Sequence, residues 1–136
     1  MNQYQTMPSH LKKINAWDAH NHGIYGEGIG IAVLDTGIYP HPDFISNPFF
    51  NNVSTRFHSY GCIAAFTDFI NGKEQPYDDT NHGTHICGII ASGKKDIYGN
   101  CHGIAPKAHL VCAKVLDAKG NGKTFTTLAA FQWVLR

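Results

Sequence analysis

Three short apolar runs divide the chain and predict buried β-strands. They span residues 30–38, 64–69 and 109–116. The first run ends in a carboxylate and a glycine, which is typical of a strand that is buried in a parallel sheet and stops at an acid. Helix-like segments, including residues 126–136, alternate with the runs. This alternation predicts an α/β fold with a mostly parallel sheet and right-handed crossovers.

The segments before and between the strands are less regular. Apolar residues recur at the period of a helix at Leu11, Ile14 and Trp17, so residues 11–20 predict a short amphipathic helix. Residues 45–63 are polar and rich in aromatic side chains, and they show no clear period. We interpret them as a surface insertion.

Residues 81–91 predict a further helix with a histidine at its start. Small and apolar residues follow His82, as suits a helix packed on a sheet, and residues 78–81 offer polar side chains that can cap the first turn. A histidine in this position is held rigidly with one edge free, which a general base requires. A structural histidine and a metal ligand remain alternatives at this point.

Asp35 strengthens the interpretation as a base. It ends the first predicted strand, and in open α/β sheets sites form at the carboxyl ends of strands. His82 follows 47 residues later. An acid at a strand end and a histidine at a helix start fit an Asp–His pair, in which the carboxylate fixes the imidazole tautomer and stabilises the imidazolium ion.

Three blocks of sequence resemble those of the subtilisin-like serine proteases. They read AVLDTGIYPHPDF from residue 32, NHGTHICGIIA from residue 81 and GIAPKAHLVCAKVLDAKGNG from residue 103. The blocks stand in the family's order and register. The resemblance implies a three-layer α/β fold, of which this chain holds the first half, with Asp35 as the triad aspartate and His82 as the triad base.

The same resemblance implies further roles. Gly120, Asn121 and Gly122 form an edge to which the substrate backbone adds as an antiparallel strand, with the glycines permitting close approach. Asp43, in His-Pro-Asp, is a candidate ligand of a structural calcium ion. Some family members carry a calcium loop that corresponds to residues 92–100, but two adjacent lysines oppose calcium there. No cofactor is required for the chemistry.

Three other patterns resemble a metal site, a dinucleotide-binding site and a phosphate-binding loop. In each case one feature of the sequence argues against that site. His85 shares a helix face with His82, but no third metal ligand is identifiable, and the resemblance makes His85 a structural residue beneath the site. The glycines of residues 26–30 precede a strand, whereas a dinucleotide fingerprint follows one. Residues 117–124 have the layout of a phosphate-binding loop, but Asp117 stands where that loop requires glycine. A nucleotide-binding protein remains a rival hypothesis.

The nucleophile is missing from the pattern. The serines of the chain are Ser9, Ser46, Ser54, Ser59 and Ser92. None lies in the Gly-Thr-Ser-Met-Ala context of the family's nucleophile. The resemblance therefore places the serine and the oxyanion-hole asparagine beyond residue 136.

We therefore predict a serine endopeptidase that hydrolyses peptide bonds by an Asp-His-Ser triad. The 136 residues alone are expected to be inactive, with the missing C-terminal half of the domain as their partner. Without that half we expect unpaired strand edges, exposed apolar surface, and marginal stability or self-association. The alternative function is that of an inactive truncated fragment that binds extended peptides.

Composition is that of an ordinary globular chain. Charged residues make up 15% and the formal net charge is +1, so charge gives no reason to expect nucleic acid or a membrane as partner. The first residues lack the pattern of a secretory signal, and no run reaches membrane-spanning length. The four cysteines form no CxxC pair and predict free thiols in a reducing compartment. We expect a cytoplasmic protein, or a secreted one if Met1 is not the natural start. Its expected parts are an N-terminal arm and short helix (residues 1–22) and a partial peptidase catalytic domain (residues 23–136).

Overall fold

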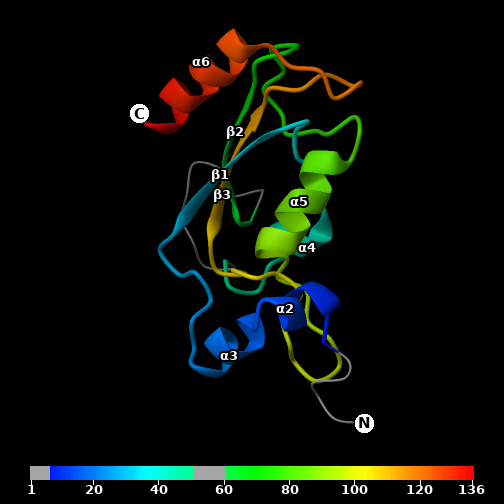
Figure 1. Ribbon diagram of the computed structural model, residues 1–136, viewed down its shortest axis with the longest axis vertical. Coiled ribbons are helices and arrows are strands. Elements are labelled where there is room, and N and C mark those ends of the chain that lie inside the picture. Colours follow the sequence, from blue (N-terminus) through cyan, green and yellow to red (C-terminus); the bar gives the residue numbers. More distant parts are fainter. Residues whose placement is uncertain (1–6, 51–60) are drawn as a thin grey trace.

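The structure, a computed structural model, describes residues 7–50 and 61–136. Its centre is a parallel β-sheet of three strands in the order β1-β3-β2 (Figure 1). The strands are β1 (Gly30–Asp35), β2 (Ile63–Asp68) and β3 (His109–Lys114). Asp35 and Asp68 both lie opposite Lys114 in the register, so all three strands end at the same edge. The predicted α/β fold with a parallel sheet is confirmed.

Helices cover both faces of the sheet. In the described residues they are α2 (Ser9–Lys13), α3 (Ala16–Asn21), α4 (Pro42–Ile45), α5 (His82–Ala91) and α6 (Thr124–Val134). Alternate residues of a strand point to opposite faces. Val33 and Cys112 belong to the core cluster that contains residues of α5. Their neighbours Leu34 and Ala113 belong instead to the cluster around Ala130 of α6, so α5 and α6 pack on opposite faces and give three layers.

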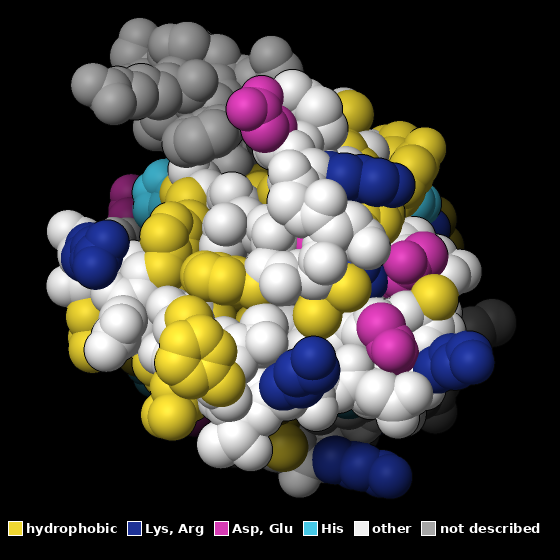
Figure 2. Space-filling model, turned by 90° about the horizontal axis from the view of Figure 1, so that it is seen from above, with side chains coloured by type: hydrophobic (Ala, Val, Ile, Leu, Met, Phe, Trp, Pro, Cys, Tyr) yellow, Lys and Arg dark blue, Asp and Glu magenta, His cyan; other side chains and the backbone are white. Residues whose placement is uncertain are grey.

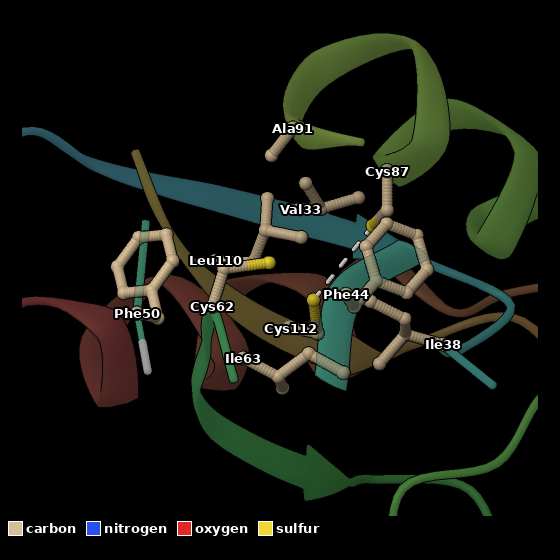
Figure 3. Close-up of a cluster of buried hydrophobic side chains, with 10 residues drawn as sticks. All are labelled: Val33, Ile38, Phe44, Phe50, Cys62, Ile63, Cys87, Ala91, Leu110 and Cys112. Carbon is tan, nitrogen blue, oxygen red and sulfur yellow. Dashed lines mark hydrogen bonds between the residues drawn. The ribbon is translucent and has the colours of Figure 1, made fainter. Parts of the chain in front are cut away.

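The larger core lies between the sheet and α5 (Figure 3). Its buried residues are Val33, Ile38, Phe44, Phe50, Cys62, Ile63, Cys87, Ala91, Leu110 and Cys112. The Sγ atoms of Cys87 and Cys112 lie 3.8 Å apart, and all four cysteines are buried free thiols, as predicted. Burial raises the pKa of the Cys62 thiol to about 12, so this thiol stays protonated and unreactive near neutral pH.

The prediction of one helix over residues 11–20 is wrong. Asn15 adopts the left-handed conformation, with φ 57°, and separates α2 from α3. Asparagine enters this conformation more readily than most residues. The break turns Ile14 outward, to 59% exposure, while Leu11 and Ala16 are buried in a small cluster of their own.

The segment interpreted as a surface insertion, residues 45–63, begins in the core. Asn47 and Phe50 are both buried. The Asn47 side chain donates to the carbonyl oxygen of Pro106 at 2.9 Å and accepts a backbone N–H two residues on at 3.1 Å. These bonds tie the segment to the loop before β3, so the interpretation is wrong for this part. Residues 51–60 lie outside the described residues.

The outer side of α6 is apolar and uncovered. Phe125, Leu128, Phe131 and Leu135 are exposed, and hydrophobic side chains gather at the surface of this end of the molecule (Figure 2). Among the described strands, β1 and β2 each have one unpaired edge. Soluble monomers rarely expose large apolar patches, so this surface favours association. No helix of the described residues combines the length and the hydropathy that crossing a membrane requires.

Replacing Phe125 and Leu128 together by serine is expected to weaken self-association at least about tenfold, because a large apolar side chain contributes roughly 1.5–3 kcal/mol when fully buried. Sedimentation velocity over a concentration series gives the dissociation constants. The matched control replaces Ile97, which is 91% exposed on a separate loop, by serine and should leave the constant unchanged. A wild-type chain that stays monomeric at all concentrations contradicts the expectation.

Candidate active site

The end of β1 lies beside the start of α5 (Figure 1), and Asp35 and His82 meet there. Nδ1 of His82 lies 2.8 Å from Oδ1 of Asp35. The same carboxylate oxygen accepts the N–H of Thr36 at 2.7 Å. The side chain of Asp35 is 14% exposed and that of His82 is 62% exposed. The carboxylate is therefore shielded and oriented, while the other edge of the imidazole faces outward without a hydrogen-bond partner in the described residues.

Asp35 raises the pKa of His82 above its ordinary value of 6.5. The hydrogen bond from Nδ1 of His82 to Asp35 is the main cause, the charge of Asp35 comes second, and the charge of Asp78 adds to both. The protonated ring is thus stabilised, as a base requires when it takes up a proton. Because the folded-state pKa is raised, this contribution to stability is fully present below pH 6.5 and is lost as the pH rises through the folded-state pKa.

Gly83 lets α5 approach the loop after β1. A Cβ atom at this position would overlap the carbonyl oxygen of Gly37 and would lie 3.2 Å from Oδ1 of Asp35. The N–H of Gly83 donates to the hydroxyl of Thr36 at 3.0 Å. Glycine at this position is therefore what permits the spacing that brings His82 to Asp35.

Asp78 connects the loop after β1 to the start of α5. Its Oδ2 accepts the N–H and the hydroxyl of Thr84, at 2.9 and 2.6 Å. Its Oδ1 accepts the hydroxyl of Thr36 at 2.9 Å and the N–H of Thr80 at 3.1 Å. Burial alone would raise the pKa of Asp78, but these hydrogen bonds, led by those from Thr84, outweigh it and hold the pKa at about 2. The carboxylate stays charged and fastens the start of α5 to the loop after β1.

The caps predicted from residues 78–81 form in part. Asp78 and the Thr80 hydroxyl both accept N–H groups of the first turn. Asn81 adopts the left-handed conformation and makes no side-chain cap bond. The third capping side chain is that of Thr36, which the sequence reasoning missed because it lies 47 residues before the N–H group that it accepts.

Replacing Asp78 by alanine is expected to destabilise the chain by about 1–3 kcal/mol, because several donors lose a charged acceptor. The folded-state pKa of Asp78 is depressed, so its contribution is complete above pH 3.8 and is lost as the pH falls toward about 2. Urea unfolding of both forms between pH 2 and pH 7 measures this. A matched control, Asp18→Ala at an exposed carboxylate, should change the free energy of unfolding by less than about 0.5 kcal/mol. A pH-independent difference for Asp78→Ala contradicts the prediction.

The predicted peptide-binding residues Gly120, Asn121 and Gly122 form an exposed turn after β3. Within it, Oδ1 of Asp117 accepts the N–H groups of Lys119 at 2.8 Å and of Asn121 at 2.9 Å. Asp117 thus occupies backbone N–H groups that a phosphate would need, which argues against nucleotide binding there. A cavity of about 280 Å³ beside the turn is lined by Phe69, Ile70, Asp117, Asn121, Gly122, Lys123 and Thr126.

The candidate calcium ligand Asp43 already has protein partners. Its Oδ2 accepts the hydroxyl of Ser92 at 2.9 Å, and its Oδ1 lies 3.3 Å from Nδ1 of His41. Among the described residues, no group of three or more His, Cys, Asp or Glu side chains is arranged to hold a metal ion. Calcium at Asp43 stays a prediction. His85, expected beneath the site, is instead exposed on α5.

Comparison with known protein families identifies the family of this chain. Residues 26–136, which are most of the chain, match the family described as "Subtilase family". This chain belongs to the subtilase family. All three sequence blocks fall within the matched residues, so the resemblance read from them is confirmed. Subtilase membership supports a serine-type peptidase.

Relatives of this subtilase include several named proteases. It is 35% identical to the serine protease AprX of Bacillus subtilis, 36% identical to a thermostable alkaline protease of Halalkalibacterium halodurans, and 33% identical to subtilisin Savinase of Lederbergia lenta. The alignments cover 96%, 96% and 95% of this chain but only 26%, 31% and 41% of the respective relatives. The subtilase chain therefore spans between a quarter and about two-fifths of the length of these relatives.

Proposed function

We propose that this chain contributes the acid and the base of a serine endopeptidase that hydrolyses peptide bonds with an Asp-His-Ser triad. The observation that carries the proposal is the 2.8 Å bond between Nδ1 of His82 and Oδ1 of Asp35, at an imidazole whose opposite edge is open. The nucleophilic serine lies beyond residue 136 in this proposal. In support, Ser92 donates to Asp43, and no serine in the described residues makes a hydrogen bond to His82.

Each residue of the pair has its own part in the reaction. Asp35 holds the His82 ring with a proton on Nδ1, so that Nε2 can accept one. Nε2 takes the proton of the serine hydroxyl as the serine oxygen attacks the substrate carbonyl carbon, and Asp35 stabilises the imidazolium that forms. His82 then gives the proton to the leaving amine. Water that His82 activates in the same way hydrolyses the acyl-enzyme, and calcium at Asp43 would be a structural ion only.

The proposed substrate is a polypeptide that lies in extended form along Gly120, Asn121 and Gly122. These residues are exposed, and the segment that leads to them starts beside the acid, because the carbonyl oxygen of Asp35 accepts the N–H of Leu116 at 3.2 Å. Addition of an extended peptide to an exposed backbone edge gives affinity through main-chain hydrogen bonds.

We place the boundary of the catalytic domain at residue 23, after an N-terminal arm and short helices within residues 1–22. The family match, which starts at residue 26, supports this division. The partner of the chain is the C-terminal half of the domain, which carries the nucleophile in this proposal.

Labelling with a fluorophosphonate probe tests the proposed function, because the reagent reacts with a serine that a neighbouring base activates. The 136-residue chain alone should remain unlabelled. The chain joined to the segment encoded after residue 136 (hereafter the joined protein) should be labelled and should cleave a chromogenic peptide. A joined protein that is not labelled, or one that is still labelled after His82→Ala, refutes the proposal.

A second candidate function is the binding of extended peptides without cleavage. The exposed turn of Gly120, Asn121 and Gly122 favours it, since this surface is present without a nucleophile. A reading frame that stops after residue 136 would make it the function to test. Calorimetric titration of the chain with an extended peptide measures the affinity, and the absence of any heat of binding contradicts this function.

A further inference from the structure

Lys114 is a fully buried lysine at the carboxyl end of the central strand, with 0% exposure. Its ammonium group uses all three of its N–H donors. Nζ donates to the carbonyl oxygen of Thr36 at 2.6 Å, to Oδ1 of Asp79 at 2.8 Å and to the carbonyl oxygen of Leu116 at 2.9 Å. Burying an ammonium ion costs several kcal/mol, and an apolar side chain would fill such a position without that cost. The contacts themselves therefore point to the role of this lysine.

The three acceptors belong to three segments of the proposed active site. Thr36 follows Asp35 directly, and its N–H holds the Asp35 carboxylate. Asp79 lies in the segment that leads to His82. Leu116 opens the turn that holds the proposed peptide-binding residues. One ammonium group thus bonds to the segments that carry the acid, the base and the proposed peptide-binding turn.

We propose that Lys114 is a positioning residue that sets the geometry of the Asp35–His82 pair while its own donors go to other groups. The proposal rests on the proposed function for its catalytic meaning. Without the ammonium, the Thr36 carbonyl loses its partner. Thr36 also carries the N–H that binds Asp35 and the hydroxyl that accepts the N–H of Gly83. A shift of Thr36 therefore displaces the carboxylate and the start of α5 relative to each other.

Loss of the ammonium group can change the pKa of His82 in two ways, and the two changes have opposite signs. Loss of a nearby positive charge alone leaves the pKa of His82 unchanged or raises it, because a cation disfavours the protonated ring. Loss of the geometry lowers this pKa, because the hydrogen bond from His82 to Asp35 is the main cause of its elevation. Asp35 and Asp78 are the charged groups that raise it. A fall therefore reports lost positioning rather than lost charge.

NMR titration of the His82 ring in the 136-residue chain tests the proposal. Lys114→Met removes the donors and keeps an unbranched side chain, and Lys107→Met, at a lysine that pairs with Glu27 at 3.2 Å, is the matched control. Asp35→Ala removes both the acceptor and the charge and supplies the value for complete loss of the pair. We expect Lys114→Met to lower the pKa of His82 by at least about 0.5 unit toward 6.5 and Lys107→Met to change it by less than about 0.2 unit. A folded Lys114→Met chain with an unchanged or raised pKa overturns the proposal.

If circular dichroism shows that the Lys114→Met chain is unfolded, Asp79→Ala decides the question. This variant removes one of the three acceptors, from a side chain that is 33% exposed. Titration in about 0.5 M salt screens longer-range charge effects. The control, Asp79→Asn, removes the same charge but keeps a side-chain oxygen that can accept from Nζ of Lys114. We expect a lower pKa of His82 in Asp79→Ala than in Asp79→Asn, and equal values overturn the proposal.

The titration needs neither a nucleophile nor a substrate, so its outcome is separate from that of probe labelling. Labelling of the joined protein without a shift in Lys114→Met would uphold the proposed function and remove the positioning role. A shift without labelling would uphold the coupling between Lys114 and the pair and contradict the proposed function.

Discussion

Replacing His82 by alanine is expected to lower the kcat of the joined protein by roughly 10⁶-fold, and replacing Asp35 by alanine by roughly 10⁴-fold, the losses known for the base and the acid of subtilisin. Without the base, the serine has no proton acceptor. Without the acid, the base is present but loses its orientation and the stabilisation of its charged form. Steady-state rates with a chromogenic peptide measure both losses.

His85→Ala is the matched control for His82→Ala. His85 lies on the same helix and is exposed, and it makes no hydrogen bond or ion pair with Asp35, whose partner among the described histidines is His82. Its replacement should retain most of the activity. A His82→Ala protein as active as the wild type would remove the base from the mechanism, and a loss for Asp35→Ala larger than that for His82→Ala would contradict the assigned roles.

Gly83→Ala is expected to destabilise the chain by about 1–3 kcal/mol, the usual range for overpacking a tight site. The added methyl group would overlap the carbonyl oxygen of Gly37, which is backbone and cannot rotate away. Relief of that overlap requires α5 to move away from β1, so the pKa of His82 should also fall toward 6.5. Urea unfolding and NMR titration measure the two effects.

Gly88→Ala provides the comparison on the same helix. A Cβ atom at Gly88 meets nothing within 4 Å, and alanine is favoured over glycine in a helix interior by up to about 1 kcal/mol. The two substitutions should therefore change stability in opposite directions. If Gly83→Ala is as stable as Gly88→Ala, the close approach of α5 to the loop after β1 is not a constraint on this fold.

The strands and the Asp–His pair could be predicted because their signals are local. Residues 31–34 and 110–113 are continuous apolar runs, and such runs form buried parallel strands. Parallel strands that end at one edge bring an acid such as Asp35 to that edge, where a helix start can meet it. The residue types alone left several roles open for His82. The resemblance of the sequence blocks to those of the family then assigned Asp35 as the acid and His82 as the base.

The parts that could not be predicted depend on contacts between distant residues. Lys114 is one charge at the end of an apolar run, and only the fold shows that Thr36, Asp79 and Leu116 converge on it. The break at Asn15 was missed for a different reason. Leu11, Ile14 and Trp17 keep a helical spacing on both sides of Asn15, although the backbone is left-handed there. The spacing of apolar residues alone therefore does not reveal the end of α2.

The position of β3 has a consequence for the order of folding. β3 is the last of the three strands in the sequence and the middle one in space, so β1 and β2 pair with β3 and not with each other. The pairing joins residues as distant as Gly30 and His109, and contacts of such long range form slowly. During synthesis from the N-terminus, β1 and β2 therefore lack β3, their partner among the described strands, until residues 109–114 have been made. We therefore expect the acid and the base to reach their final geometry only when β3 docks, because Lys114 of β3 bonds to Thr36 and Asp79.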